Sequence, residues 1–456
     1  MEFYKDQLVN VTIEDMGKDG TGVGKVDGYA LFIKDAVIGD VVRAKIMKTK
    51  ASYGYARLTE ILKPSPHRTE PVCPFARQCG GCQLQTLAYP QQLSFKENAV
   101  RQNLGHIGGL PKAILDSIME PIIGMENPFR YRNKAQFPVG RDKDGQIITG
   151  FYAGRTHKII PNRECYLGIP QNSAILDTVI NHMEKHHIAP YDETSGKGLV
   201  RHVLTRCGFQ TGEIMVCLVI NGKNLPHAEK LAHQLETIPG MTSILLNINK
   251  QRNNVILGET NTLVWGKPYI TDCIKDLQFC ISPQSFFQVN PRQTEKMYEK
   301  ALEYAALTGE ETVWDLYCGI GSISLFLARH AKKVYGVEIV PVAVQNARAN
   351  ARLNCLDNIE FFTGKAEEIL PAKYQDGQMH ADVIVVDPPR KGCDTALLDT
   401  ILQAKPRRVV YVSCDSATLA RDVKYLRQGG YELKSVCPID NFPMTCHTEA
   451  ICLLSI

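Results

Sequence analysis

Five short apolar segments, separated by stretches of helical spacing, constrain the fold of this chain more than any other feature. They cover residues 312–316, 333–338, 359–362, 382–387 and 408–413. Short apolar runs with helical spacers between them are typical of parallel strands buried on both faces. The pattern predicts an α/β domain with a doubly wound sheet over residues 276–456, introduced by a helix at 292–307. Residues 431–436 and 450–456 are candidates for strands that close this sheet.

The first 62 residues predict a small all-β module instead. Short apolar runs at 30–33 and 41–46 follow a turn-rich, glycine-rich stretch at 17–24. Short strands punctuated by glycine and aspartate are typical of a small, OB-like β-barrel. We therefore expect residues 1–62 to form a barrel of their own.

The end of this module carries a run of cations with two tyrosines among them. Between residues 43 and 68 there are seven Lys or Arg and a single acid, Glu60, with Tyr53 and Tyr55 interleaved. A barrel face that binds single-stranded nucleic acid combines cations with aromatic rings. An ordinary solvated face explains the charges alone equally well. The seven cations are Arg43, Lys45, Lys48, Lys50, Arg57, Lys63 and Arg68.

The middle of the chain has mixed α/β character. Residues 64–67 contain two prolines and predict a linker. We expect residues 63–275 to form a central α+β domain, in which a helix near 90–120 packs on the C-terminal domain.

One segment of the central part alternates strictly between two faces. A strand at 130–137 would place Arg130, Arg132, Lys134 and Gln136 on the same side. Three cations on one face suit contact with RNA phosphates. An ordinary half-exposed strand is the other interpretation.

Composition and the first residues bear on where the chain works. Among its 456 residues, 44% of them hydrophobic, no apolar run approaches a membrane span, which takes about 18 residues. The start at Met1 lacks the basic and apolar regions of a signal peptide. Fifteen Cys without an export signal favour reduced thiols. We expect a cytoplasmic protein without a membrane partner, and the net charge of +4 adds little.

Three cysteines upstream have the spacing of a metal site. Five residues separate Cys73 from Cys79, and two residues separate Cys79 from Cys82. A fourth ligand is required, and Cys165 is available downstream. Four thiolates suit structural zinc or an iron–sulfur cluster, and the spacing does not decide between them.

A glycine loop follows the first strand of the C-terminal domain. Gly319 and Gly321 would let the backbone approach a nucleotide-like ligand, and Glu338, 19 residues past Gly319, could bind ribose hydroxyls. Ser324 replaces the third glycine of the dinucleotide fingerprint, and the acid Asp315 precedes the loop. S-adenosylmethionine therefore fits better than NAD, and a purely structural turn is the alternative.

Chemically useful side chains follow the later strands of the sheet. Asp387 ends the fourth strand, and Cys414 follows the fifth, where a thiol at the mouth of a site could be a nucleophile. A buried, inert thiol is the alternative. Glu449 lies just before the last strand and would be a general base if the fold brings it near Cys414.

Together these residues resemble the RNA uracil-5-methyltransferase family, in its branch that modifies 23S ribosomal RNA. The resemblance spans nearly the whole chain and is most specific at residues 387–392, 409–414 and 440–449. It implies a class I methyltransferase domain with Cys414 as nucleophile and Glu449 as base. It also implies S-adenosylmethionine contacts at Gln288, Tyr317, Glu338 and Asp387.

The same resemblance assigns the upstream parts. It implies a [4Fe–4S] cluster, with zinc as the alternative, and a TRAM domain at residues 1–62. The implied cluster ligands are Cys73, Cys79, Cys82 and Cys165. Three departures stand out: Asp415 and Ser416 replace the usual Asn-Pro after the nucleophile, Thr448 replaces an apolar residue before the base, and Lys365 stands at a cofactor-contact position where related enzymes can have Asn, so that role is not carried over.

The function implied by the resemblance is methylation of uracil C5 in 23S rRNA by a monomer without an obligate protein partner. Methylation of tRNA is the first alternative. It is disfavoured because the resembling tRNA branch lacks the four cysteines and the barrel. A non-catalytic iron–sulfur RNA-binding protein is the alternative of another class, since it would not need Cys414 and Glu449.

Overall fold

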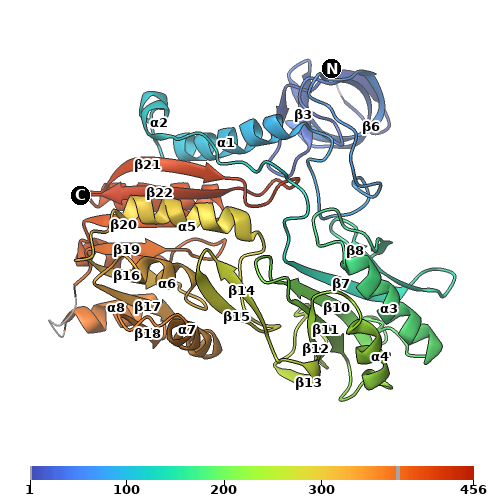
Figure 1. Cartoon of the computed structure of the whole chain (residues 1–456). Coiled ribbons are helices and arrows are strands. Elements are labelled where there is room, and N and C mark those ends of the chain that lie inside the picture. Colours follow the sequence, from blue (N-terminus) through green and yellow to red (C-terminus); the bar gives the residue numbers. More distant parts are fainter. Residues whose placement is uncertain (1–2, 376–379) are drawn as a thin grey trace.

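The computed structural model describes residues 3–375 and 380–456 and contains three main sheets. An N-terminal module stands above the rest, and the central and C-terminal sheets lie side by side below it (Figure 1). Within the described ranges, no helix is long and apolar enough to cross a membrane.

The N-terminal module is one curved sheet of six strands in the order β1-β5-β6-β4-β3-β2. Its alternating apolar residues, among them Val11 and Ile46, form a small separate core. A Cβ on Gly24 would come within 2.2 Å of the Thr12 carbonyl oxygen, so the first and third strands touch and only glycine fits between them. The strands are β1 (Leu8–Thr12), β2 (Asp15–Met16), β3 (Gly22–Val26), β4 (Tyr29–Lys34), β5 (Val41–Thr49) and β6 (Tyr53–Lys63).

The segment expected to be a linker is tied to this module. Ser65 is buried, and its backbone N–H donates to Asp40 Oδ1 at 2.9 Å. Arg68 forms an ion pair with the fully buried Asp40 carboxylate. Because a buried carboxylate needs these partners, the predicted linker at residues 64–67 is held against the N-terminal module.

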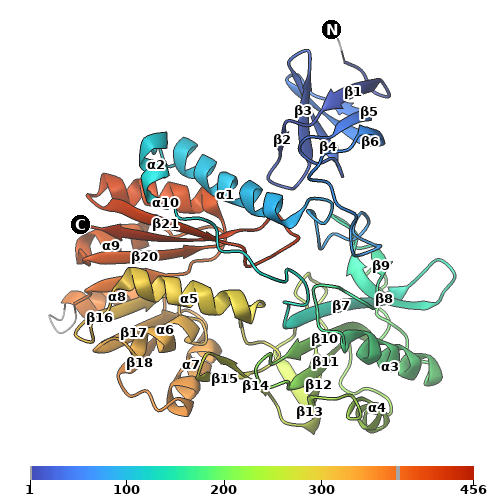
Figure 2. The same cartoon turned by 45° about the horizontal axis from the view of Figure 1, so that its top comes forward.

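Two helices of the next segment pack on the C-terminal sheet. Helix α1 (Tyr89–His106) begins with proline in its first turn and lies along α10 and β21 (Figure 2). Its buried face repeats every four residues, as a helix in contact along one side requires. That face consists of Gln92, Lys96, Val100 and Leu104. The short α2 (Lys112–Ile118) follows.

The central sheet has seven strands in the order β13-β12-β11-β10-β7-β8-β9. Helices α3 (Asn172–Lys185) and α4 (Ala228–Leu235) cover one face through their apolar sides. The strands are β7 (Lys134–Arg141), β8 (Ile147–Tyr152), β9 (Ile159–Pro161), β10 (Val200–Cys207), β11 (Ile214–Ile220), β12 (Met241–Ile248) and β13 (Thr260–Gly266).

The predicted strand at 130–137 is wrong at its start. Strand β7 begins at Lys134, because Arg130 has a positive φ of 52° and leaves the extended region. The Arg130 guanidinium instead donates to the carbonyl oxygens of Cys165 and Gly168. Arg132 pairs with Gly168 in an isolated bridge, so residues 130–132 follow another segment of the chain.

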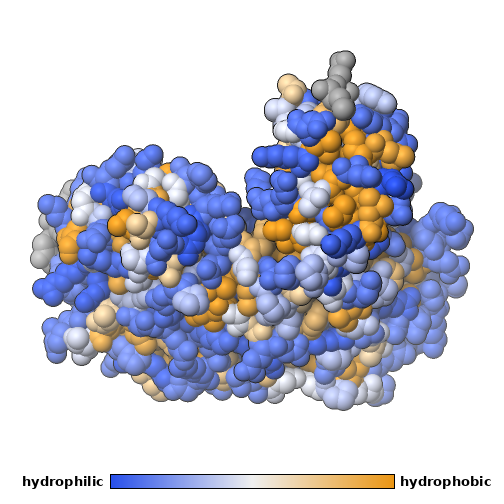
Figure 3. Space-filling view, turned by 90° about the horizontal axis from the view of Figure 1, so that it is seen from above, coloured by the Kyte–Doolittle hydropathy of each residue, from blue (hydrophilic) through white to orange (hydrophobic). Residues whose placement is uncertain are grey.

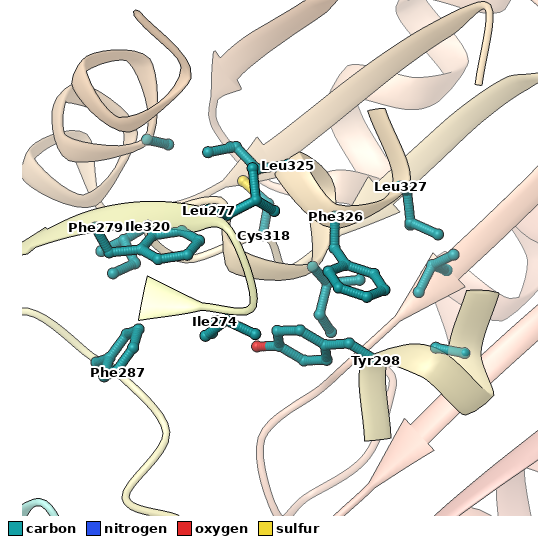
Figure 4. Close-up of a cluster of buried hydrophobic side chains, with 14 of the residues drawn as sticks. Ile274, Leu277, Phe279, Phe287, Tyr298, Cys318, Ile320, Leu325, Phe326 and Leu327 are labelled. Atoms are coloured by element: carbon teal, nitrogen blue, oxygen red, sulfur yellow. The ribbon is translucent and has the colours of Figure 1, made fainter. Parts of the chain in front are cut away.

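The other face of the central sheet shares an apolar core with the C-terminal part. Leu204, Met215 and Leu245 from the central strands belong to the same cluster as Phe279 and Phe287. The hairpin β14 (Ile270–Ile274) and β15 (Leu277–Ile281) lies between the two sheets (Figure 1). Its Ile274, Leu277 and Phe279 belong to this cluster (Figure 4). Burial of one continuous core makes the two parts a single packed unit.

The C-terminal sheet has the order β18-β17-β16-β19-β20-β22-β21, parallel except for β22. Two separate apolar clusters cover its faces, so the doubly wound sheet is confirmed. Its strands are β16 (Thr312–Leu316), β17 (Lys333–Glu338), β18 (Ile359–Thr363), β19 (Val383–Val386), β20 (Arg408–Ser413), β21 (Glu432–Ile439) and β22 (Glu449–Ser455). Its helices are α5 (Pro291–Ala305), α6 (Ser322–Ala328), α7 (Pro341–Leu353), α8 (Ala366–Gln375), α9 (Thr395–Ala404) and α10 (Ser416–Gln428).

Candidate active site

The glycine loop lies where the strand order of the C-terminal sheet reverses. Strand β16 pairs with β17 on one side and with β19 on the other, and ligands of such sheets bind at the carboxyl ends beside this point. Gly319 and Gly321 have φ of 55° and 83°, and Tyr317 has φ of 135°, which is strained for a residue with a side chain. A Cβ on Gly319 would meet no atom within 4 Å, so open space adjoins the loop.

Two acids hold this loop. The Glu338 carboxylate accepts from the Gly319 N–H at 3.1 Å and from the Val340 N–H at 2.8 Å. Asp315 accepts from the Ser324 hydroxyl, which explains the serine where a dinucleotide fingerprint has glycine. The second Asp315 oxygen is buried without a hydrogen-bond partner, and burial raises the pKa of this carboxyl to about 7. An unsatisfied buried carboxylate oxygen on the strand that leads into this loop suits a ligand that donates hydrogen bonds.

The strand register brings Cys414 and Glu449 together. Ser413 pairs with Ala450 across the antiparallel strands β20 and β22. Cys414 directly follows Ser413 and Glu449 directly precedes Ala450, so both residues flank the last pair of this ladder, and the Glu449 carboxylate is near enough to raise the pKa of the Cys414 thiol. The sheet thus brings together a partly buried thiol and a buried carboxyl at its ligand-binding edge.

Negative charge is crowded at this edge. Burial and the neighbouring Asp387 raise the pKa of Glu449 to about 8, and burial and Asp315 raise the pKa of Asp387 to about 7. Burial, Glu449 and Asp387 raise the pKa of the Cys414 thiol to about 11, while the Arg390 guanidinium opposes this shift. A cationic ligand would relieve the mutual repulsion of these groups.

A loop before α5 places the next predicted residue. Gln288 is 9% exposed, and its carbonyl oxygen accepts from the Asn133 side chain at 2.9 Å. Phe287 is buried in the shared core, whereas Phe286 is 69% exposed. The two phenylalanines therefore differ in role, and only Phe286 is free to contact a ligand.

The four predicted cysteine ligands line one cavity of about 320 Å³, together with Arg132 and Lys134. Within the described ranges, no three His, Cys, Asp or Glu side chains are grouped closely enough for a single metal ion. The Gly81 N–H donates to Cys79 Sγ at 3.4 Å. Burial raises the pKa of Cys82 to about 12, and those of Cys73 and Cys79 are raised for the same reason.

Three of the seven cations between residues 43 and 68 are neutralised by ion pairs in the structure. Arg68 pairs with Asp40, Arg43 with Glu60 at 2.7 Å and Lys45 with Asp6 at 2.8 Å. Four exposed cations make no ion pair within the described part of the chain: Lys48, Lys50, Arg57 and Lys63.

Three aromatic rings lie on strands β4 and β6 of the same module. Phe32, Tyr53 and Tyr55 are mutual neighbours with ring centroids 5.7 Å apart, and Tyr55 is 46% exposed. Figure 3 shows, in addition, hydrophobic residues gathered on the visible face of the N-terminal module. Aromatic rings beside unpaired cations are the combination expected for stacking on nucleotide bases.

Two residues of the active-site edge, Arg390 and Asn441, have no role assigned from the sequence, although both lie in the segments 387–392 and 440–449 that carry the resemblance. Asn441 is fully buried, and its amide interacts with Glu449 although neither side-chain atom has a hydrogen bond of good geometry. The Arg390 guanidinium lies 3.3 Å from His447 Nε2 at the exposed rim.

Comparison with known proteins identifies the family. Residues 130–456 match the tRNA (uracil-5-)-methyltransferase family, and residues 2–59 match the TRAM domain. A protein of Halalkalibacterium halodurans named as an uncharacterized RNA methyltransferase is 50% identical over 99% of this chain and 98% of its own length. A protein of the same description from Clostridium acetobutylicum is 48% identical over 99% and 97%.

A solved structure matches over nearly the whole chain. The Pyrococcus abyssi tRNA (uracil-54, C5)-methyltransferase in complex with S-adenosyl-L-homocysteine is 26% identical, with a TM-score of 0.78 over 98% of this chain and 100% of that one. A match of this extent includes the N-terminal module. The chain therefore belongs to the tRNA (uracil-5-)-methyltransferase family and is an RNA uracil-C5 methyltransferase with an N-terminal TRAM domain.

Proposed function

We propose that this enzyme methylates uracil C5 in 23S ribosomal RNA, with Cys414 as nucleophile and Glu449 as general base. The observation that carries the mechanism is that Cys414 and Glu449 flank the Ser413–Ala450 pair of β20 and β22, at the edge that holds the glycine loop, and are close enough to interact electrostatically. S-adenosylmethionine is the methyl donor of the family.

The proposed chemistry follows from the weakness of uracil C5 as a nucleophile. The Cys414 thiol loses its proton to solvent, and the thiolate then forms a bond to C6 and converts the ring into an enolate with carbanion character at C5. Bound S-adenosylmethionine supplies the electrophilic methyl group that C5 takes up. Glu449 then accepts the C5 proton, and the bond between C6 and Cys414 breaks to regenerate the thiolate.

The donor site has the charge that a sulfonium ligand requires. Asp315, Asp387 and Glu449 are buried or partly buried acids whose pKa values are raised by burial and by a neighbouring carboxylate. A cation near them stabilises their ionised forms. We assign contacts with the donor to Gln288, Tyr317, Glu338 and Asp387, around the open space beside Gly319.

The RNA requires its own contacts. A stacked uridine must be extruded to reach Cys414, at a cost of a few kcal/mol. The exposed ring of Phe286 is available to stack on the extruded base. We place the flanking RNA on the N-terminal module, where Phe32, Tyr53 and Tyr55 adjoin unpaired cations.

We propose a [4Fe–4S] cluster in the cysteine cavity, held by Cys73, Cys79, Cys82 and Cys165. The four thiols line one cavity of about 320 Å³, which has room for a cluster of several atoms, whereas a zinc ion with zinc–sulfur bonds of about 2.3 Å would need all four thiolates close around it. Buried thiols with raised pKa values stay protonated unless a metal centre binds them. The N–H donor on Cys79 suits a cluster ligand.

A tRNA substrate is the second candidate. The Pyrococcus abyssi enzyme, named for its action on tRNA, matches this chain over 98% of its length. The presence of the N-terminal module therefore does not separate the two substrates. Our preference for 23S rRNA rests on the motif resemblance described above.

Substitution of the two reacting residues tests the mechanism. Cys414→Ala should abolish methyl transfer while binding of S-adenosylmethionine persists. Glu449→Gln should slow turnover by about 10² to 10⁴ and leave a protein–RNA adduct that survives denaturing gels. Glu432→Gln, an exposed acid on the adjacent strand, is the control. Activity in the Cys414 variant would refute the nucleophile.

The raised pKa of Glu449 predicts a pH dependence. The base works only when ionised, and its pKa is raised to about 8. Below this pH, release of the adduct in a single turnover should rise about tenfold per pH unit, and above it the rate should level off. Asp387→Asn removes the negative neighbour and should shift this curve to lower pH when S-adenosylmethionine is saturating. A rate independent of pH between 6 and 9 would contradict the assignment.

The substrate is tested in cells and in vitro. Deletion of the gene should remove 5-methyluridine from 23S rRNA and leave tRNA unchanged, measured by mass spectrometry of the separated RNAs. The purified enzyme should restore the modification on the rRNA of the deletion strain. Loss of the nucleoside from tRNA alone would establish the second candidate.

The cluster is tested by metal content. Protein purified without oxygen should contain about four iron and four sulfide per chain, with broad visible absorbance. Cys79→Ala and Cys165→Ala should lose this absorbance, while Cys355→Ala, at an exposed thiol elsewhere, should keep it. Stoichiometric zinc without visible absorbance would rule out the cluster.

A further inference from the structure

The loop between β21 and β22, residues 440–448, is held from outside the C-terminal sheet. Each of its first five carbonyl oxygens accepts a hydrogen bond from a residue remote in sequence. Asp440 accepts from Gln293 at 3.1 Å, Asn441 from Asn290 at 3.0 Å, Phe442 from Lys96 at 3.0 Å, Pro443 from Tyr131 at 3.0 Å, and Met444 from the N–H groups of Gln83 and Leu84 at 3.0 Å. The path of the chain into Glu449 is therefore set by other elements.

Lys96 supplies the charged contact in this set. Its ammonium is fully buried, donates to the Phe442 carbonyl oxygen and forms an ion pair with the fully buried Asp440 carboxylate. The Tyr89 hydroxyl donates to the other Asp440 oxygen at 2.9 Å. Burial lowers the pKa of Lys96, and Asp440 opposes that shift.

Stability alone does not explain such a pair. Replacing a buried ion pair by uncharged residues is often neutral or stabilising, whereas removal of one partner is costly. A buried ion pair does fix the relative position of the two elements that carry it, because either charge would be left buried and unpaired if they moved apart. Lys96 comes from α1, and Asp440 from the start of the loop, so the pair fixes one element against the other.

The two sequence neighbours of Asp440 both lie beside Glu449. Ile439, the residue before Asp440, pairs with Glu449 in the sheet register. Asn441, the residue after Asp440, is fully buried, and its amide forms no hydrogen bond of good geometry but lies near enough to the Glu449 carboxyl to counteract the rise in its pKa. A displacement of Asp440 would therefore move the backbone and the amide beside the proposed base.

We propose that Lys96 is a positioning residue for proton removal: through Asp440 and Phe442 it holds the 440–448 loop so that the Glu449 carboxylate faces C5. This inference rests on the proposed role of Glu449. It predicts that loss of Lys96 slows proton removal and leaves the earlier addition of Cys414 intact.

RNA that contains 5-fluorouridine separates the two steps. Cys414 addition and methylation can proceed on it, but fluorine at C5 cannot leave as a proton, so the covalent adduct accumulates without help from Glu449. Lys96→Met in the full-length protein should form this adduct within about twofold of the native rate. On ordinary RNA it should slow methylation by about 30-fold or more and accumulate an adduct that survives denaturation.

Three further variants control the experiment. Arg101→Met removes a partly exposed cation of the same helix and should leave both steps unchanged. Lys96→Arg keeps the charge and should recover part of the elimination rate. Lys96→Met with Asp440→Asn removes both charges, so it should recover thermal stability but not the elimination rate.

The outcomes decide separately between the two proposals. Equal slowing of both steps in Lys96→Met, or full recovery of elimination in the double variant, would make the ion pair merely structural and overturn the inference. Unchanged methylation in Lys96→Met would overturn it as well. Failure of the native enzyme to form any adduct with 5-fluorouridine RNA would instead overturn the proposed role of Cys414.

Discussion

The position of β22 is the constraint on which the active site depends. This strand runs antiparallel between β20 and β21, so its first residue lies at the same edge as the last residues of the parallel strands. A parallel strand at this place would put Glu449 at the opposite edge, far from Cys414. Because β22 is antiparallel to β20, the pairing of Ser413 with Ala450 brings the residues next to them, Cys414 and Glu449, to the same edge of the sheet.

The rest of the chain supports the loop that feeds this strand. Helix α1, the start of α5, the segment after the cysteines and Tyr131 all donate to it. The N-terminal module reaches it as well, since a Cβ on Gly20 would lie 2.9 Å from Cys446 Sγ. Parts that handle RNA or a metal centre in our proposal are therefore in physical contact with the segment that positions the proposed base.

Much of the C-terminal fold could be predicted because its strands are uninterrupted apolar runs. The predicted strands at 312–316, 333–338 and 408–413 have the observed bounds, and the family comparison confirms the methyltransferase fold and the TRAM domain. Alternation misled at 130–137, since residues 130–132 alternate without belonging to a strand. The roles of the site residues and the domain boundaries stay predictions.

Other features lay beyond the reach of the sequence. The closeness of Cys414 and Glu449 depends on strand order, which no local pattern encodes. Lys96 lies on the buried face of α1, in a series of residues spaced four apart. In a sequence, a lysine at such a position is normally taken to be exposed to solvent. The partner of Lys96, Asp440, is 344 residues away, so only the folded chain reveals the pair.

The core shared by the central and C-terminal sheets has a consequence for how such enzymes can be rearranged. A central fragment cut before the β14–β15 hairpin would present Leu204, Met215 and Leu245 to water, an apolar face prone to aggregation. The central part therefore cannot be moved into another protein by itself. A chimaera that exchanges it between relatives must include the β14–β15 hairpin, or redesign the apolar residues on both sides of the shared core.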